Sequence, residues 1–298
     1  MDKLQAILSN LRERAASNTA STCQSSTTSN DKCPKCNGMG IVFYRKVDSE
    51  TGQENEYGKD CECQEIVKQR ARYKNAMIPE EYENYNFKNF EIREEVHDTM
   101  LKKITDYLKS FPSKKPNEEI VRKLDDKLRI KGPSFGFIAT YGEQRIKNIE
   151  NPQLRASIKR EHNNYGVGKS HLTISAAKYL IKNGYRVQVV SDPVFIQDLM
   201  TSKFKNDNGE TFNNILSNIT QYADFVVWDD LGKLKWTEPR EDLYYQIFNE
   251  LYKLGKPIIF SSNEDVETLA DKIGPAASSR LKGMCSGFLY PVEGKDQR

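Results

Sequence analysis

The chain has 298 residues, of which 37% are hydrophobic and 29% are charged, and its formal net charge is only +3. This length and polarity suit one sizeable domain with its own core and a smaller module beside it. So small a charge does not by itself indicate nucleic-acid binding, which would have to rest on local patches. No stretch approaches the ~20 apolar residues that cross a bilayer, and the N-terminus lacks a secretory signal, so we expect a cytoplasmic protein with no membrane partner.

The first 31 residues divide into a helix and a polar tether. Residues 1–14 carry leucine and isoleucine at helical spacing, which predicts a short N-terminal helix. Such a helix either docks onto a partner or packs on its own chain. Residues 15–31 are rich in Ser, Thr and Asn and have little apolar content, so we expect a flexible linker there.

Four of the six cysteines form two close pairs, Cys33 with Cys36 and Cys61 with Cys63. Four thiolates at this spacing suit a closed, tetrahedral Zn²⁺ site. A redox pair at the first two cysteines is the alternative, but no βαβ pattern surrounds it and a second pair follows. The cysteines and the basic helical stretch after them predict a zinc module over residues 32–76. Its role, as a docking knob for a protein or as a contact for single-stranded nucleic acid, remains open.

Residues 77–298 alternate between strands and helices after an aromatic-rich entry segment, residues 79–90, which we expect to be extended. The predicted elements are, in chain order, a helix over 94–110, a strand over 135–140, a helix over 169–183, strands over 186–191 and 224–228, a helix over 241–254, and strands over 257–261 and 287–291. This alternation predicts an α/β domain whose mainly parallel sheet is covered by helices.

A glycine-bearing turn before the helix at 169–183 has the composition of a phosphate-binding loop. Gly166 and Gly168 allow successive backbone N–H groups to face phosphate oxygens, Lys169 would reach the β and γ phosphates, and Ser170 would hold Mg²⁺. We therefore expect ATP and Mg²⁺ at this turn.

The loop departs from the usual pattern at its first glycine, because Asn163 stands where glycine is expected. Deleting residues 143–163 would join Gly142 directly to Asn164 and restore a continuous loop. We interpret these 21 polar residues as an insertion that loops out and leaves Gly142 in the phosphate turn.

Polar residues follow two later strands. Asp229 and Asp230 end an apolar run, which would let the first carboxylate serve Mg²⁺ while the second polarises water. Asn263 ends another apolar run and is the candidate for holding the attacking water. Arg280 follows two serines at a predicted helix edge, from which it either faces solvent or reaches the nucleotide of a neighbouring subunit.

These motifs together resemble the DnaC/DnaI helicase loaders, which are AAA+ P-loop ATPases. The resemblance covers about residues 32–290. It is carried by the cysteine pairs, the segment Ile78-Pro79-Glu80-Glu81-Tyr82, and the runs Gly-x-Gly-Lys-Ser-His-Leu, Trp-Asp-Asp-Leu-Gly, Ser-Ser-Asn and Ser-Arg-Leu. The ATPase motifs also occur in the IstB transposition ATPases, which lack the cysteine module.

The resemblance implies a division of labour. Residues 32–76 would grip a hexameric replicative DNA helicase, and an AAA+ domain over 77–298 would bind ATP and single-stranded DNA and self-associate. Asp230, Asn263 and Arg280 would be the catalytic residues. Asp230 replaces the glutamate common in AAA+ proteins, so hydrolysis is expected to be weak. A zinc-anchored adaptor or inhibitor of the helicase with little hydrolysis, and an IstB-like transposition ATPase, are the alternatives.

Overall fold

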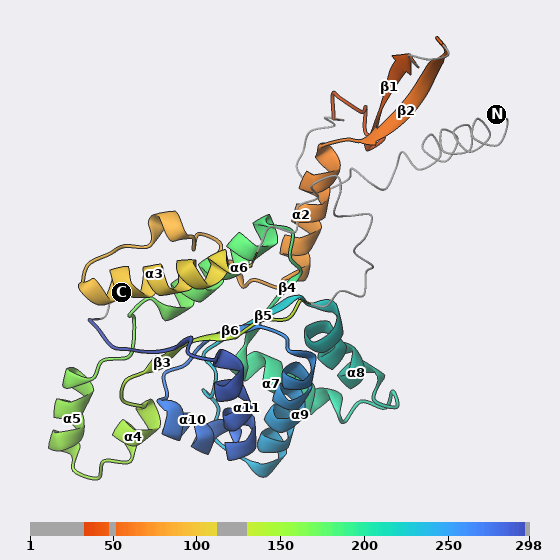
Figure 1. Ribbon diagram of the computed structural model, residues 1–298. Helices are drawn as coiled ribbons and strands as arrows, with labels where there is room; N and C mark the ends of the chain where they lie inside the picture. The colour runs from red at the N-terminus through yellow and green to blue at the C-terminus, as the bar shows by residue number, and fades with distance from the viewer. Residues whose placement is uncertain (1–32, 48–51, 112–129, 296–298) are drawn as a thin grey trace. The chain divides into compact units, whose positions relative to one another are not determined.

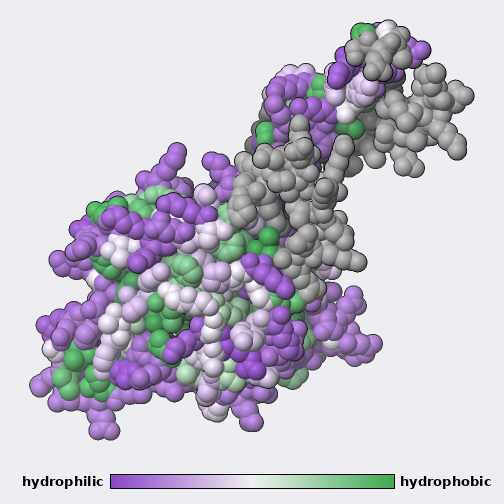
Figure 2. Space-filling model, in the orientation of Figure 1, coloured by the Kyte–Doolittle hydropathy of each residue, from purple (hydrophilic) through white to green (hydrophobic). Residues whose placement is uncertain are grey.

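The computed structural model describes residues 33–47, 52–111 and 130–295 (Figure 1). The predicted N-terminal helix and linker lie outside this part of the chain. Contacts divide the chain into two compact units, residues 1–71 and residues 72–298. None of the described helices is long and apolar enough to cross a membrane, and hydrophilic residues predominate on the face drawn in Figure 2.

The smaller unit is built on an antiparallel hairpin. Strands β1 (Ile41–Val47) and β2 (Glu54–Asp60) pair in a register that sets Tyr44 opposite Tyr57. The basic helix α2 (Cys63–Asn75) follows, and the division between the units falls within it. No residue of α2 is fully buried, and Tyr73, near its end, packs partly buried against the apolar core of the larger unit.

The larger unit contains a five-stranded sheet in which every pairing is parallel. Its strands stand in the order β4-β5-β6-β3-β7. Their bounds are β3 Phe135–Ala139, β4 Val187–Ser191, β5 Phe225–Asp229, β6 Ile258–Ser261 and β7 Leu289–Val292. The three central strands are buried at every residue, as expected for parallel strands covered on both faces. The predicted parallel sheet is confirmed.

Helices cover both faces of this sheet (Figure 1). On one face, an apolar cluster is formed with α3 (Glu95–Lys109) and α6 (Lys169–Lys182). A second cluster forms on the other face with α7 (Asp192–Ser202), α9 (Glu238–Leu254), α10 (Val266–Ile273) and α11 (Pro275–Cys285). Helix α8 (Glu210–Ser217) continues into a π-helical turn, η3 (Asn218–Tyr222).

The expectation of an extended entry segment was wrong. The chain instead forms two 3₁₀ turns, η1 (Glu80–Tyr82) and η2 (Phe87–Asn89). The side chain of Asn86 accepts hydrogen bonds from the backbone N–H groups of Lys88 and Asn89, and this cap stabilises the second turn. The aromatic pattern predicted an extended segment because it does not register the asparagine cap that stabilises this turn.

Residues 143–163 form a projection, here called the arm, with two helices, α4 (Glu143–Lys147) and α5 (Pro152–Glu161). The chain leaves the body after β3 and returns where the amide of Asn164 donates to the carbonyl of Tyr141. The ring of Tyr141 also stacks on His162, with ring centroids 5.0 Å apart. The two ends of the arm therefore lie side by side next to the phosphate loop.

Candidate nucleotide and metal sites

The four paired cysteines converge in the smaller unit. All four Sγ atoms lie within 4.8 Å of one another, and the Cys33–Cys61 and Cys36–Cys63 separations are 3.8 and 3.5 Å. Sulfurs placed ~2.3 Å from one central ion at tetrahedral angles would lie ~3.8 Å apart, so the donor set fits Zn²⁺.

Local backbone structure supports this cluster. Gly40 has a positive φ of 73°, and its N–H donates to Cys36 Sγ at 3.2 Å. A side chain at Gly40 would also meet Gln64, at 2.9 Å from its Cβ. Hydrogen bonds from the backbone N–H groups of Cys36 and Lys35 lower the pKa of Cys33 to about 7, whereas burial raises the pKa of Cys63.

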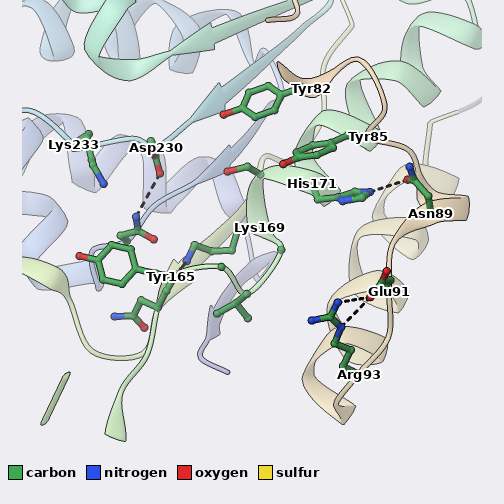
Figure 3. Close-up of a pocket in the computed structure, with 16 residues that line it drawn as sticks. Tyr82, Tyr85, Asn89, Glu91, Arg93, Tyr165, Lys169, His171, Asp230 and Lys233 are labelled. Carbon is green, nitrogen blue, oxygen red and sulfur yellow. Dashed lines mark hydrogen bonds and ion pairs between the residues drawn. The ribbon is translucent and has the colours of Figure 1, made fainter. Parts of the chain in front are cut away.

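The larger unit has a cavity of about 400 Å³ above the phosphate loop (Figure 3). Three parts of the chain line it: the loop and the start of α6, the polar residues after β5 and β6, and the entry segment with the residues just after it. Because the sheet is parallel, the carboxyl ends of β3, β5 and β6 meet at one edge and bring these parts together.

The phosphate loop has the backbone conformation that an anion site needs. Gly166 and Gly168 have φ values of +66° and +89°, and Gly168 caps the N-terminus of α6. Side chains rarely adopt such angles, so glycine is required there. Lys169 is buried beside the cavity, and its Nζ donates to the carbonyl of Asn164 at 2.6 Å. The loop therefore offers a helix N-terminus and an ammonium group to a phosphate.

The two neighbouring acids have different environments. Asp229 is buried; its Oδ1 accepts from Ser261 at 2.6 Å and its Oδ2 from the Tyr82 hydroxyl at 3.0 Å. Asp230 lines the cavity with a positive φ of 54° and lies 3.5 Å from the amide of Asn263. Burial and the adjacent Asp229 charge raise the pKa of Asp230. Asp230 is therefore the more accessible of the two.

The entry segment closes one side of the cavity with aromatic rings. Tyr85 stacks almost parallel on His171, with centroids 4.4 Å apart and planes at 4°. His171 Nε2 lies 2.9 Å from the carbonyl of Asn86, and burial lowers the pKa of His171. Figure 3 shows Tyr82, Tyr85 and Asn89 around the cavity from this side. The aromatic pattern of residues 79–90 predicted an entry segment but no role at the site.

Comparisons with known proteins agree with this geometry. Residues 144–283 match the family model of the bacterial DnaA ATPase domain. Chromosomal replication initiator DnaA of Caldanaerobacter subterraneus subsp. tengcongensis is 30% identical over 113 residues, 36% of this chain and 24% of that protein. DnaA of Aquifex aeolicus is 32% identical over 128 residues, 43% of this chain and 30% of that protein. The chain therefore spans less than a third of these relatives' length.

The fold has a counterpart among solved structures. A crystal structure of the DnaC helicase loader superposes with a TM-score of 0.50 and 18% identity, covering 72% of this chain and all of that one. The larger unit has the α/β fold of an AAA+ domain. The α/β fold class and the four-cysteine module, both predicted from the sequence, are therefore confirmed.

Three predicted site residues of this AAA+ domain do not line the cavity: the buried Asp229, which lies next to Asp230, and Gly142 and Arg280. Gly142 donates its N–H to Asp265 at 2.8 Å, and a Cβ there would come within 2.0 Å of the Thr268 hydroxyl. Arg280 donates to Asn249 at 3.0 Å and lies over the Tyr245 ring, 4.7 Å from its centroid. Gly142 thus forms the base of the arm, while Arg280 lies on the surface formed by α9 and α11.

An exposed aromatic residue of the AAA+ domain was missed by the sequence reasoning. Phe204 follows α7 and is 87% exposed, more than any other large apolar side chain in the described residues. Lys203 and Lys205 flank it, and both are exposed. An aromatic residue between two lysines is a signal that the sequence contained.

Proposed function

We propose that this protein is an ATP-dependent loader that binds a replicative DNA helicase and delivers it onto single-stranded DNA. The observation that carries the proposal is the pairing of a nucleotide cavity in an AAA+ domain with a separate four-cysteine unit. The fold likeness to a DnaC helicase loader supports it.

The phosphate loop would bind ATP and place its γ-phosphate at the carboxyl edge of the sheet. Lys169 would exchange its bond to Asn164 for one to phosphate oxygens. Ser170 and Asp229 would hold Mg²⁺, because hydroxyl and carboxylate oxygens are the ligands that this ion prefers. The ion would neutralise the charge that develops on the phosphates. Gly166 and Gly168 would present their backbone N–H groups to the same phosphates.

Hydrolysis would be driven by Asp230 and Asn263. Asn263 would orient a water molecule whose oxygen attacks the γ-phosphorus, while the bond from that phosphorus to the β–γ bridging oxygen breaks and ADP leaves. Asp230 would polarise the water and accept its proton, and its raised pKa suits a base. Aspartate is shorter than the glutamate usual in AAA+ proteins, so we expect slow turnover that suits a switch.

The remaining parts would provide the partners. The smaller unit, with Zn²⁺ on its four cysteines, would grip the helicase. Phe204 would stack on a base while Lys203 and Lys205 attract the flanking phosphates of single-stranded DNA. Arg280 would reach the nucleotide of a neighbouring copy and stabilise charge in the transition state.

A second candidate, a replication initiator, is favoured by the match of residues 144–283 to the DnaA ATPase domain. An adaptor or inhibitor of the helicase would use the cysteine unit but not ATP hydrolysis, and an IstB-like ATPase would bind a transposase. Only the loader predicts that a helicase is delivered to DNA in an ATP-dependent manner.

A loading assay separates these functions. The purified chain, a replicative hexameric helicase and circular single-stranded DNA would be mixed with ATP, and helicase bound to the circle would be counted. Wild-type protein is expected to increase loading, and Lys169→Ala to abolish the increase. Lys182→Ala, at the exposed far end of α6, is the matched control and should act as wild type. Equal loading by wild type and Lys169→Ala would contradict the loader.

A further inference from the structure

Helix α5 of the arm lies exposed beside the nucleotide site. No residue of this ten-residue helix is buried, and the apolar side chain of Leu154 is 52% exposed. In Figure 1, α5 lies at the edge of the AAA+ domain next to α4. Most short helices are stabilised by packing one face against a core, and α5 has no such face. The Nε groups of Arg155 and Arg160 donate to the carbonyls of Ile149 and Ala156, which leaves the other guanidinium N–H groups available to a partner.

The cations of the arm fall into two groups. Arg145 and Lys147 are neutralised locally, the first by Asp265 and Glu267 and the second by Glu143. The cations of α5 are Arg155, Lys159 and Arg160, and within the described residues they form no ion pair. The only acid of α5 is Glu161, so the helix carries a net positive charge.

We propose that α5 is a binding site for the phosphate backbone of single-stranded nucleic acid. Arg155 and Lys159 are four residues apart and so lie on one face, separated by about 6 Å along the axis. A stacked strand rises ~3.4 Å per nucleotide along its axis, so this axial separation is close to the rise between alternate phosphates. The exposed Leu154 next to this face offers apolar contact to a sugar or base. This inference rests on the proposed binding of single-stranded DNA and assigns it a second contact, separate from Phe204.

The arm is bonded to the nucleotide site at its N-terminal end. The backbone N–H of Glu143 donates to the carbonyl of Asn263 at 2.9 Å. Burial and the neighbouring carboxylate of Glu143 raise the pKa of Tyr165, which belongs to the phosphate loop. The candidate sensor and the phosphate loop therefore share one anchoring residue of the arm.

The C-terminal end is bonded to the same loop. The amide of Asn163 donates to the carbonyl of Tyr165 at 2.8 Å, and the ammonium of Lys159 lies over the Tyr165 ring, 5.9 Å from its centroid. A strand bound on α5 would therefore order the arm and, through Tyr165, the phosphate loop. Because linkage is reciprocal, single-stranded DNA on α5 should raise the affinity for ATP, and ATP should raise the affinity for DNA.

A charge-neutral variant of the full chain tests the site. Arg155→Gln, Lys159→Gln and Arg160→Gln would be combined, and binding of a fluorescent oligothymidylate would be measured by anisotropy over a range of salt. We expect affinity to fall about 10- to 100-fold near 0.1 M salt, and the slope of log affinity against log salt to weaken by about 2, since three phosphate contacts are lost. Affinity for a non-hydrolysable ATP analogue should rise with oligonucleotide in the wild type and not in this variant.

A matched control removes the same number of charges elsewhere. The control combines Lys102→Gln and Lys109→Gln on α3 with Lys182→Gln on α6. It should bind oligonucleotide with an affinity within about twofold of wild type, because surface lysines away from a bound strand contribute little to the affinity. An equal loss in this control would overturn the proposal. Oligonucleotide affinity in the α5 variant equal to that of the wild type would also overturn the proposal. In that outcome, a loss of self-association by the same variant would indicate that α5 instead meets an acidic surface of a second copy. If wild-type protein bound no oligonucleotide, DNA binding itself would fail. If the wild type binds the oligonucleotide and the α5 variant binds it equally well, only the role of α5 is overturned.

Discussion

The two units of this chain are stabilised in different ways. Among the described residues up to position 71, only Cys36 and Cys61 are buried, whereas the AAA+ domain buries apolar clusters on both faces of its sheet. A small module without an apolar core needs a cross-link or a metal to fold, while a domain of over 200 residues does not. The cysteine cluster therefore acts as the core of the smaller unit, and the two units should respond independently to damage.

Removal of metal should have the largest effect. A structural zinc site contributes about 10–16 kcal/mol to the folding of a small module, so chelation or Cys36→Ser should unfold the smaller unit. Limited proteolysis should then cleave within residues 33–71, while the melting temperature of the AAA+ domain stays unchanged. Re-adding Zn²⁺ after chelation should restore protection. A smaller unit that stays protected without metal would remove the contrast between the units.

Overpacking the sheet should damage the other unit. A Cβ at Gly136, in β3, would lie 2.3 Å from the ring of Phe260. Gly136→Ala should therefore destabilise the AAA+ domain by about 1–3 kcal/mol, measured by urea unfolding, and leave zinc content unchanged. Gly283→Ala in α11 is the matched control, since its Cβ would meet nothing closer than 3.9 Å. Similar losses in both variants would show that the contact with Phe260 is not the cause.

Acid should weaken the ion pair between Arg145 and Asp265, which holds the base of the arm. Burial alone would raise the pKa of Asp265, but hydrogen bonds from Arg145, Thr268 and Gly142 outweigh it and lower the pKa to about 2. A lowered carboxyl pKa stabilises the fold above pH ~4, and this stabilisation is lost as the pH falls from ~4 to ~2. Arg145→Gln should cost about 1 kcal/mol at pH 7 and less at pH 3, measured by urea unfolding. An equal cost at both pH values would exclude this ion pair as the source.

The sequence predicted features whose signal is local. The four cysteines were identified by spacing, and the central strands by apolar runs such as residues 225–228. The contact of Tyr82 with Asp229 joins positions 147 residues apart, which no periodicity indicates. Helix α5 escaped prediction because Leu154 is exposed and so creates no buried stripe. The cap by Asn86 likewise replaced an extended segment with a turn.

Capture of a replicative helicase tests the central claim most directly. The tagged chain would be mixed with purified helicase, with and without ATP, alongside Cys36→Ser and Lys169→Ala. Our account predicts that Cys36→Ser loses the helicase because the metal-held unit grips it, whereas Lys169→Ala retains the helicase but no longer responds to ATP. Capture of the helicase by Cys36→Ser at the wild-type level would contradict the account.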